Sequence, residues 1–263
     1  MIKTFKSIYI LLSCSALLFF SSNAIAELSA QSLMDKVYGG FSTKNNCWVI
    51  MNGDNDQRYC MRIDRVDKIK AISGQRMYVL AVSEPIDENG EQEIGAHVTS
   101  GLVGAFVVEE RNGAAEIVCG ESKLSIGASG LAPRKWNFMS LGPSDYWGWQ
   151  NITGDCHQGT CGTRYSILAP FGKKIRDLAG IAASFDNSGN CGDNRCSARS
   201  SVITSTLEID STQVREKVFP LVITVSGKKD GKKIQQKSWS MPLDFKKWSY
   251  VEPKEWPLKD VEF

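Results

Sequence analysis

The residues best suited to chemistry are crowded into the segment 136–157, which holds several aromatic side chains among Asp, Asn and Gln residues. The candidate ligand-binding residues are Trp136, Tyr146, Trp147 and Trp149. Trp147 and Trp149 lie on one side of the chain if the segment is extended, since side chains alternate along a strand. Flat rings flanked by hydrogen-bonding groups suit sugars, so the segment could bind a glycan of the cell envelope. Burial of the same rings in a β-sheet core is the favoured alternative.

The same segment holds the groups that hydrolysis would need, namely Asp145, Asp155 and His157. His157 could act as a general base oriented by either carboxylate, and a pair of carboxylates could cleave a glycosidic bond. This hypothesis of a periplasmic cell-wall or polysaccharide hydrolase requires all three side chains to converge in one cleft. Against it, the sequence has no G-x-S-x-G motif before a helix, and no second histidine lies near His157 in the chain. A binding or structural module is therefore favoured over an enzyme, with no metal and no cofactor.

Seven cysteines follow residue 26, and six of them form three neighbouring pairs. These pairs are Cys47 with Cys60, Cys156 with Cys161, and Cys191 with Cys196. The last two pairs share the spacing C-x4-C, and the residues between them favour turns, so each pair can close a local disulfide. A four-thiolate zinc site built from these two pairs is the alternative, and cross-pairing between them also fits the spacing. Cys119 lies in an apolar run and is expected to be a buried, inert thiol.

The first 26 residues help to choose between disulfides and zinc. Two lysines precede an apolar run over residues 8–20, and Ala24 and Ala26 place small residues at alternate positions. This pattern is typical of a secretory signal peptide, here cleaved after Ala26, and predicts a periplasmic or secreted protein. Disulfides are then favoured, because exported thiols are oxidised. An uncleaved anchor and a lipid attached to Cys14 are the minor alternatives.

Removal of this leader leaves the chain without net charge. The leader contains two of the 31 basic residues and none of the 29 acidic residues, so 29 of each sign remain. No global positive field is left to attract nucleic acid. Lysines 228, 229, 232 and 233 cluster at a predicted hairpin tip, where protection of a sheet edge is favoured over an anionic partner. The expected partner is an envelope glycan or a protein, with no membrane span after the leader and no indication of an oligomeric state.

The elements that must position these residues are mainly β-strands. A short helix is expected after Ser29, ending at the glycines 39 and 40. Runs of strand-forming residues cover 77–82, 105–108, 115–118, 165–168 and 181–185, and Asn112-Gly113 predicts a hairpin turn. Residues 207–209 and 221–225 alternate with a period of two before a turn at 228–231. The pattern predicts antiparallel sheets in a sandwich or barrel-like domain over 27–263, or two closely packed subdomains divided near 131–135.

Overall fold

The expectation of a mainly β, antiparallel fold with a short N-terminal helix and disulfides is confirmed. The structure is a computed structural model that describes residues 29–52, 57–71, 74–111, 114–192 and 194–259. The predicted leader, including Cys14, and the predicted Asn112-Gly113 turn lie outside the described residues.

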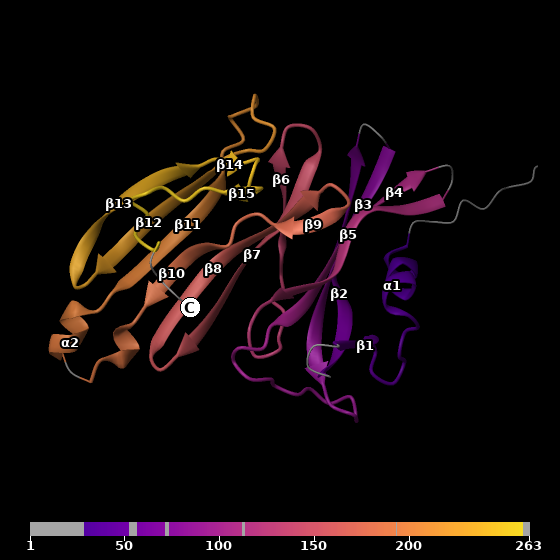
Figure 1. Cartoon of the computed structure of the whole chain (residues 1–263), viewed down its shortest axis with the longest axis horizontal. Coiled ribbons are helices and arrows are strands. Elements are labelled where there is room, and N and C mark those ends of the chain that lie inside the picture. Colours follow the sequence, from indigo (N-terminus) through magenta and orange to yellow (C-terminus); the bar gives the residue numbers. More distant parts are fainter. Residues whose placement is uncertain (1–28, 53–56, 72–73, 112–113, 193, 260–263) are drawn as a thin grey trace, which may run out of the picture.

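The first half of the chain forms one antiparallel sheet in which every strand pairs with the next along the chain. Its strands are β1 (Trp48–Asn52), β2 (Gln57–Ala71), β3 (Gly74–Ile86), β4 (Gly101–Arg111) and β5 (Ala114–Ile126). The helix α1 (Ala30–Tyr38) covers one face of this sheet (Figure 1). Ser29 caps the helix by accepting a hydrogen bond from the backbone N–H of Ser32, as the sequence predicted. Leu33 and Met34 bury the apolar side of α1 against the sheet.

The second half of the chain forms an eight-stranded sheet with the order β13-β12-β11-β10-β8-β7-β6, in which β9 also pairs with β8. Its strands are β6 (Asn137–Gly142), β7 (Tyr146–His157), β8 (Thr160–Phe171), β9 (Lys174–Asp177), β10 (Ile181–Asp186), β11 (Val202–Ile209), β12 (Leu221–Lys229) and β13 (Lys232–Met241). A short pair, β14 (Leu243–Asp244) and β15 (Ser249–Tyr250), follows. The exposed Lys232, Lys233 and Lys237 lie on β13, which is an edge strand, so their position suits protection of that edge.

The two sheets share a hydrophobic core. Alternate residues of β3 divide between the two faces of the first sheet: Val79 packs toward α1, whereas Tyr78 and Leu80 pack toward the second sheet. Trp149 of β7 and Leu168 of β8 meet them from the other side. The opposite face of the second sheet is covered by the C-terminal segment, where Trp256 and Leu258 are buried. β7 and β8 are therefore enclosed on both faces where the sheets overlap.

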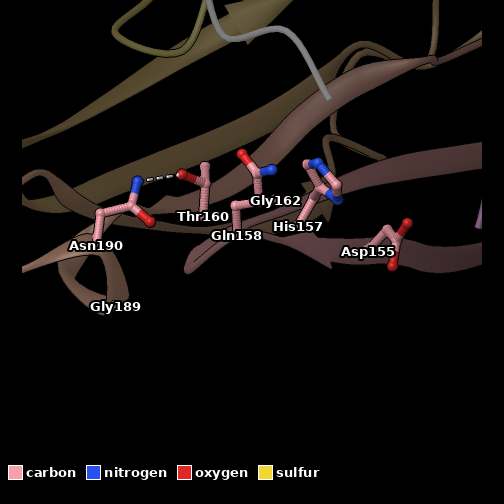
Figure 2. A pocket seen from close by; sticks show the side chains of 7 residues that line it. All are labelled: Asp155, His157, Gln158, Thr160, Gly162, Gly189 and Asn190. Atoms are coloured by element: carbon pink, nitrogen blue, oxygen red, sulfur yellow. Dashed lines mark hydrogen bonds between the residues drawn. The ribbon is translucent and has the colours of Figure 1, made fainter.

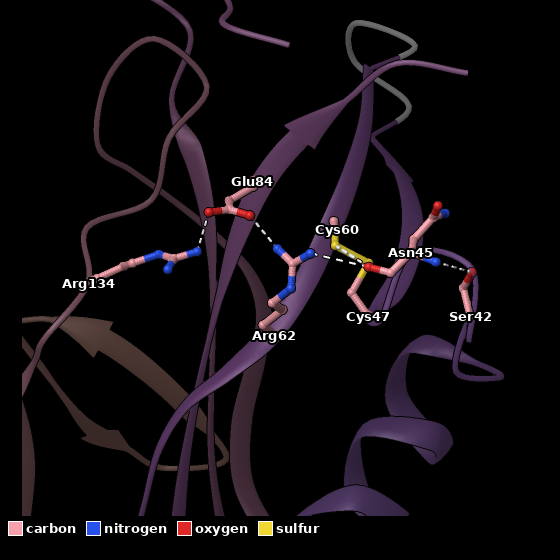
Figure 3. The surroundings of a disulfide bond; sticks show 7 residues. All are labelled: Ser42, Asn45, Cys47, Cys60, Arg62, Glu84 and Arg134. Carbon is pink, nitrogen blue, oxygen red and sulfur yellow. Dashed lines mark hydrogen bonds and ion pairs between the residues drawn. A yellow bond between two sulfur atoms is a disulfide. The ribbon is translucent and has the colours of Figure 1, made fainter. Parts of the chain in front are cut away.

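The connection between the sheets, residues 127–136, is fixed to the first sheet by charged groups. Arg134 pairs with Glu84 of β3, which also pairs with Arg62 of β2 beside the Cys47–Cys60 disulfide (Figure 3). Arg62 donates a further hydrogen bond to the carbonyl of Asn45 at 3.2 Å. The position near 131–135 at which the sequence would divide two subdomains lies in this connection.

The structure contains the three disulfides expected from the spacing, with Cα–Cα distances of 5.5 Å for Cys47–Cys60, 4.1 Å for Cys156–Cys161 and 5.1 Å for Cys191–Cys196. Neither cross-pairing nor a four-thiolate zinc site is formed by these cysteines. Cys119 is a buried free thiol. Three disulfides indicate an oxidising environment. Among the described residues, no helix is both long and apolar enough to cross a membrane.

Two regions differ from the sequence expectation. The glycine-rich stretch 137–157, for which no strand was expected, forms β6 and the long strand β7. The segment 186–201, which holds the turn-favouring residues between Cys191 and Cys196, contains a 3₁₀ turn η1 (Ser188–Asn190) and the six-residue helix α2 (Asn194–Arg199). In both cases neighbouring segments provide the stabilising contacts, namely strand pairing for β7 and the local Cys191–Cys196 bridge for α2.

Candidate functional site

The aromatic residues proposed from the sequence as a glycan site belong to the core. Trp136 and Trp149 are 1% and 0% exposed, and Trp149 packs against Tyr78 with ring centroids 5.7 Å apart. The half-buried Trp147 stacks on Phe138, with centroids at 5.0 Å and an interplanar angle of 14°. A sugar cannot stack on rings whose faces are already covered by protein. The favoured alternative, core burial, therefore describes Trp136 and Trp149.

Tyr146 also makes a structural contact. Its hydroxyl donates a hydrogen bond of 2.9 Å to the carbonyl of Pro170, and burial raises the pKa of the phenol well above its usual range. The side chain therefore fastens the start of β7 to the end of β8. None of the four aromatic candidates presents an open ring pair to solvent.

The second half of β7 is open. Asp155 and His157 lie on the same face of β7 as Trp147 and Trp149, because they follow at even spacing. Beyond Trp149 this face leaves the shared core, and Asp155 and His157 are exposed. The β7–β8 hairpin closes with Gln158 and Gly159, both at positive φ (46° and 76°), as in a two-residue type I′ turn.

His97 reaches this open end of β7 from the first sheet. It lies in the loop 87–100 between β3 and β4, and its Nδ1 is 3.5 Å from Oδ1 of Asp155. The loop is held in place by backbone hydrogen bonds: the N–H of Gly95 donates to the carbonyl of Ser129 at 3.0 Å, and the N–H of Ser129 donates to the carbonyl of His97 at 3.2 Å. Both histidines of the chain and Asp155 therefore border the same open end of β7.

These side chains line a groove, named here the histidine groove. One part, of about 500 Å³, lies between the loop that carries His97 and Val98 and the hairpin that carries Thr153 and Asp155. A second part, of about 710 Å³, continues past His157 and Thr160 to Gly189 and Asn190 (Figure 2). Both parts share Asp155, His157 and Gly162, so they form one continuous depression. The Asn190 side chain donates a hydrogen bond of 2.9 Å to the Thr160 hydroxyl and thereby fixes the far wall.

The hydrolase alternative requires Asp145, Asp155 and His157 in one cleft, and the structure places Asp145 apart from the other two. Asp145 precedes β7, whereas Asp155 and His157 lie near its other end. Ten residues of extended strand span about 33 Å. His97, which the sequence analysis did not connect with this site, takes the place beside Asp155. No local spacing could have revealed it, because a loop of the other sheet delivers it.

Two titratable groups, Glu109 and Cys119, lie near the core around Trp147 and Trp149, here called the aromatic end, and both have structural rather than catalytic roles. Burial raises the pKa of Glu109, but hydrogen bonds from Arg76 and Arg111 outweigh this effect and leave the pKa below its usual range. Burial raises the pKa of the Cys119 thiol to about 11, so the thiolate that a nucleophile requires is scarce at neutral pH. The exposed imidazoles and carboxylate of the histidine groove are the more accessible reactive set.

Comparison with known proteins does not add a functional assignment. No family model, curated protein or solved structure matches the chain. The groove itself is therefore the feature from which a function can be inferred. Its distinguishing features are two imidazoles, one carboxylate and walls drawn from both sheets.

Proposed function

We propose that this protein is an exported binding module of a bacterial envelope, acting in the periplasm or outside the cell. Its ligand is an envelope glycan or the extended segment of a protein partner, held in the histidine groove. The leader-like N-terminal sequence and the three disulfides support export. The observation that carries the binding function is the continuous groove between the His97 loop and the β7–β8 hairpin.

The lining of the groove suits a polar, extended ligand. The hydroxyls of Thr153 and Thr160 and the amides of Gln158 and Asn190 can both donate and accept hydrogen bonds. Glycines in both walls add little bulk, so a ligand can approach the backbone closely. A polar groove of this kind recognises hydroxyl or amide groups along a chain.

Binding is tested with the mature, oxidised protein. Immobilised peptidoglycan fragments, surface polysaccharide and an envelope protein extract are compared for retention of wild-type protein and of the double variant Gln158→Ala/Asn190→Ala. Each lost hydrogen bond is expected to weaken binding by about 0.5–1.5 kcal/mol, so retention should fall roughly tenfold in the double variant.

A matched control removes exposed polar groups at a distance. The variant Gln235→Ala/Gln236→Ala alters two exposed amides on β13, outside the groove lining, and should bind as wild type does. Equal binding by both double variants, or no binding to any of the three materials, would overturn the proposal.

A further inference from the structure

The histidine groove gathers a donor set that suits a transition-metal ion. The chain has only two histidines, and both line this groove together with Asp155. Imidazole nitrogen combined with carboxylate oxygen is a common ligand set for Zn²⁺ and Cu²⁺, whereas Mg²⁺ and Ca²⁺ prefer oxygen alone. The residue types therefore point to a borderline first-row metal.

Two of the donors already have the spacing of neighbouring metal ligands. Nδ1 of His97 and Oδ1 of Asp155 are 3.5 Å apart. Two ligands bound to one zinc ion at about 2.0–2.1 Å and at a tetrahedral angle are separated by about 3.4 Å. The observed separation is thus compatible with one ion bound by both atoms, and such an ion would link the loop 87–100 to β7.

His157 is the third donor. It follows Asp155 by two residues, and its ring extends from the same side of β7 (Figure 2). As the side chains are placed, no three His, Cys, Asp or Glu residues within the described ranges form a ready metal cluster. His157 is exposed, however, and an exposed side chain changes rotamer in picoseconds to nanoseconds. Residues two apart on one face of a strand are separated by about 6.6 Å, so rotation of the His157 ring toward Asp155 can bring two imidazoles and one carboxylate around one ion.

Competing thiolate ligands are excluded by the disulfides. Cys156 and Cys161, the cysteines nearest to the groove, are bonded to each other, and so are Cys191 and Cys196. The remaining described thiol, Cys119, lies buried in the core between the sheets. In the oxidised protein the described cysteines therefore offer no accessible thiolate that would compete with the groove donors.

We infer that His97, Asp155 and His157 bind one divalent transition-metal ion, Zn²⁺ or Cu²⁺, with the remaining coordination positions open. This inference rests on the proposed function in using the same groove. An ion with open positions can accept a hydroxyl, carboxylate or amide oxygen of the bound glycan or protein segment. The metal therefore acts as a direct anchor for the ligand.

Metal binding is measured by calorimetric titration of the mature, oxidised protein without an affinity tag. One equivalent of ZnCl₂ or CuCl₂ should bind, whereas MgCl₂ should not. His97→Ala and His157→Ala should each lower the affinity by at least about 10- to 100-fold, because a lost ligand weakens a site no less than a lost outer-sphere partner does. Gln235→Ala, which changes an exposed residue of β13 outside the groove lining, is the control and should leave the affinity unchanged.

The proton NMR signals of the imidazoles give a second readout. Because the chain has two histidines, the two single variants assign both sets of signals. One equivalent of Zn²⁺ should shift both sets in wild-type protein. Unchanged affinity in either histidine variant, or a shift in only one set, would overturn the inference, provided that circular dichroism shows both variants to be folded.

The same variants separate this inference from the proposed function. Retention on peptidoglycan, polysaccharide or protein that depends on Gln158 and Asn190 but persists in EDTA, together with no zinc binding, would overturn the metal site alone. Stoichiometric zinc binding without retention on any of these materials would support the metal site and overturn the proposed ligand classes.

Discussion

The two halves of β7 have the same backbone conformation and opposite roles. In the first half, Trp147 and Trp149 face the first sheet and join the core that the two sheets share. In the second half, Asp155 and His157 point from the same face into an open groove. The two halves differ in whether other parts of the protein cover this face of the strand. The first sheet overlaps only part of β7, so one continuous face changes from core to binding surface.

The two halves of β7 are therefore stabilised by different interactions. Trp149 is fully buried although its indole N–H has no hydrogen-bond partner among the described residues. Burial of about 200 Å² of indole surface contributes roughly 5 kcal/mol, which exceeds the penalty of about 1–3 kcal/mol for an unpaired N–H. At the hairpin end of β7, the Cys156–Cys161 disulfide links directly paired residues of β7 and β8. This covalent bond stabilises a part of the strand that has no hydrophobic packing on its groove face among the described residues.

Truncation of Trp149 should have the largest effect. Trp149→Ala is expected to lower the free energy of unfolding by about 3–5 kcal/mol, because it leaves a cavity between the sheets. Urea unfolding followed by circular dichroism measures this change. Trp149→Phe, which keeps most of the ring and removes the unpaired N–H, should lose less than half as much. A loss below about 1 kcal/mol for Trp149→Ala would contradict the assignment of this end to the core.

High pH should destabilise the aromatic end next. Burial raises the pKa of Cys119 from 9.0 to about 11 and that of Tyr78 from 10.0 to about 12. The folded state therefore holds both protons more tightly than the unfolded state does. The resulting stability is fully present below pH 9 and is lost as the pH rises toward 12.

Cys119→Ala isolates the thiol contribution. Wild-type protein should lose about 2 kcal/mol more than the variant between pH 9 and pH 11, as measured by urea unfolding at each pH. Identical pH profiles for the two proteins would show that the thiol is not buried against the second sheet.

Removal of the Cys156–Cys161 bridge tests the groove end. A bridge between residues five apart in sequence is worth about 2 kcal/mol in the chain-entropy model. The double variant Cys156→Ala/Cys161→Ala should lose about that much unfolding free energy, and amide exchange should accelerate at the hairpin tip before it does at Trp149. Uniform acceleration along β7 would instead show that the bridge supports the whole strand.

The sequence predicts the fold class because local signals dominate it. The capping by Ser29, the alternation of Leu221, Ile223 and Val225, and the turn at Asp230-Gly231 all depend on residues close in the chain. The three disulfides also join local partners. Such features need no knowledge of how the two sheets approach each other.

The candidate site could not be predicted in the same way, because it brings together residues that are far apart in the sequence. Asp155 and His157 could be named as candidates from their residue types, but whether they are covered depends on how far the first sheet extends over β7. His97 is separated from them in the chain by β4, β5, β6 and the first part of β7. For Trp136 and Trp149 the sequence favours core burial but leaves a ligand surface open, because sequence periodicity does not reveal their packing with Tyr78 and Leu80.

Substitution of the groove histidines should have the smallest effect on stability. The His97–Asp155 pair is a solvent-exposed contact, with side chains 67% and 40% exposed, and surface ion pairs contribute little. In metal-free buffer, His97→Ala and His157→Ala should each change the unfolding free energy by no more than about 0.5 kcal/mol. With zinc present, wild-type protein should be stabilised and both variants should not, because a ligand that binds only the folded state raises its stability. A large loss in metal-free buffer would mean that the second half of β7 is held together by its polar side chains, as the first half is by its rings.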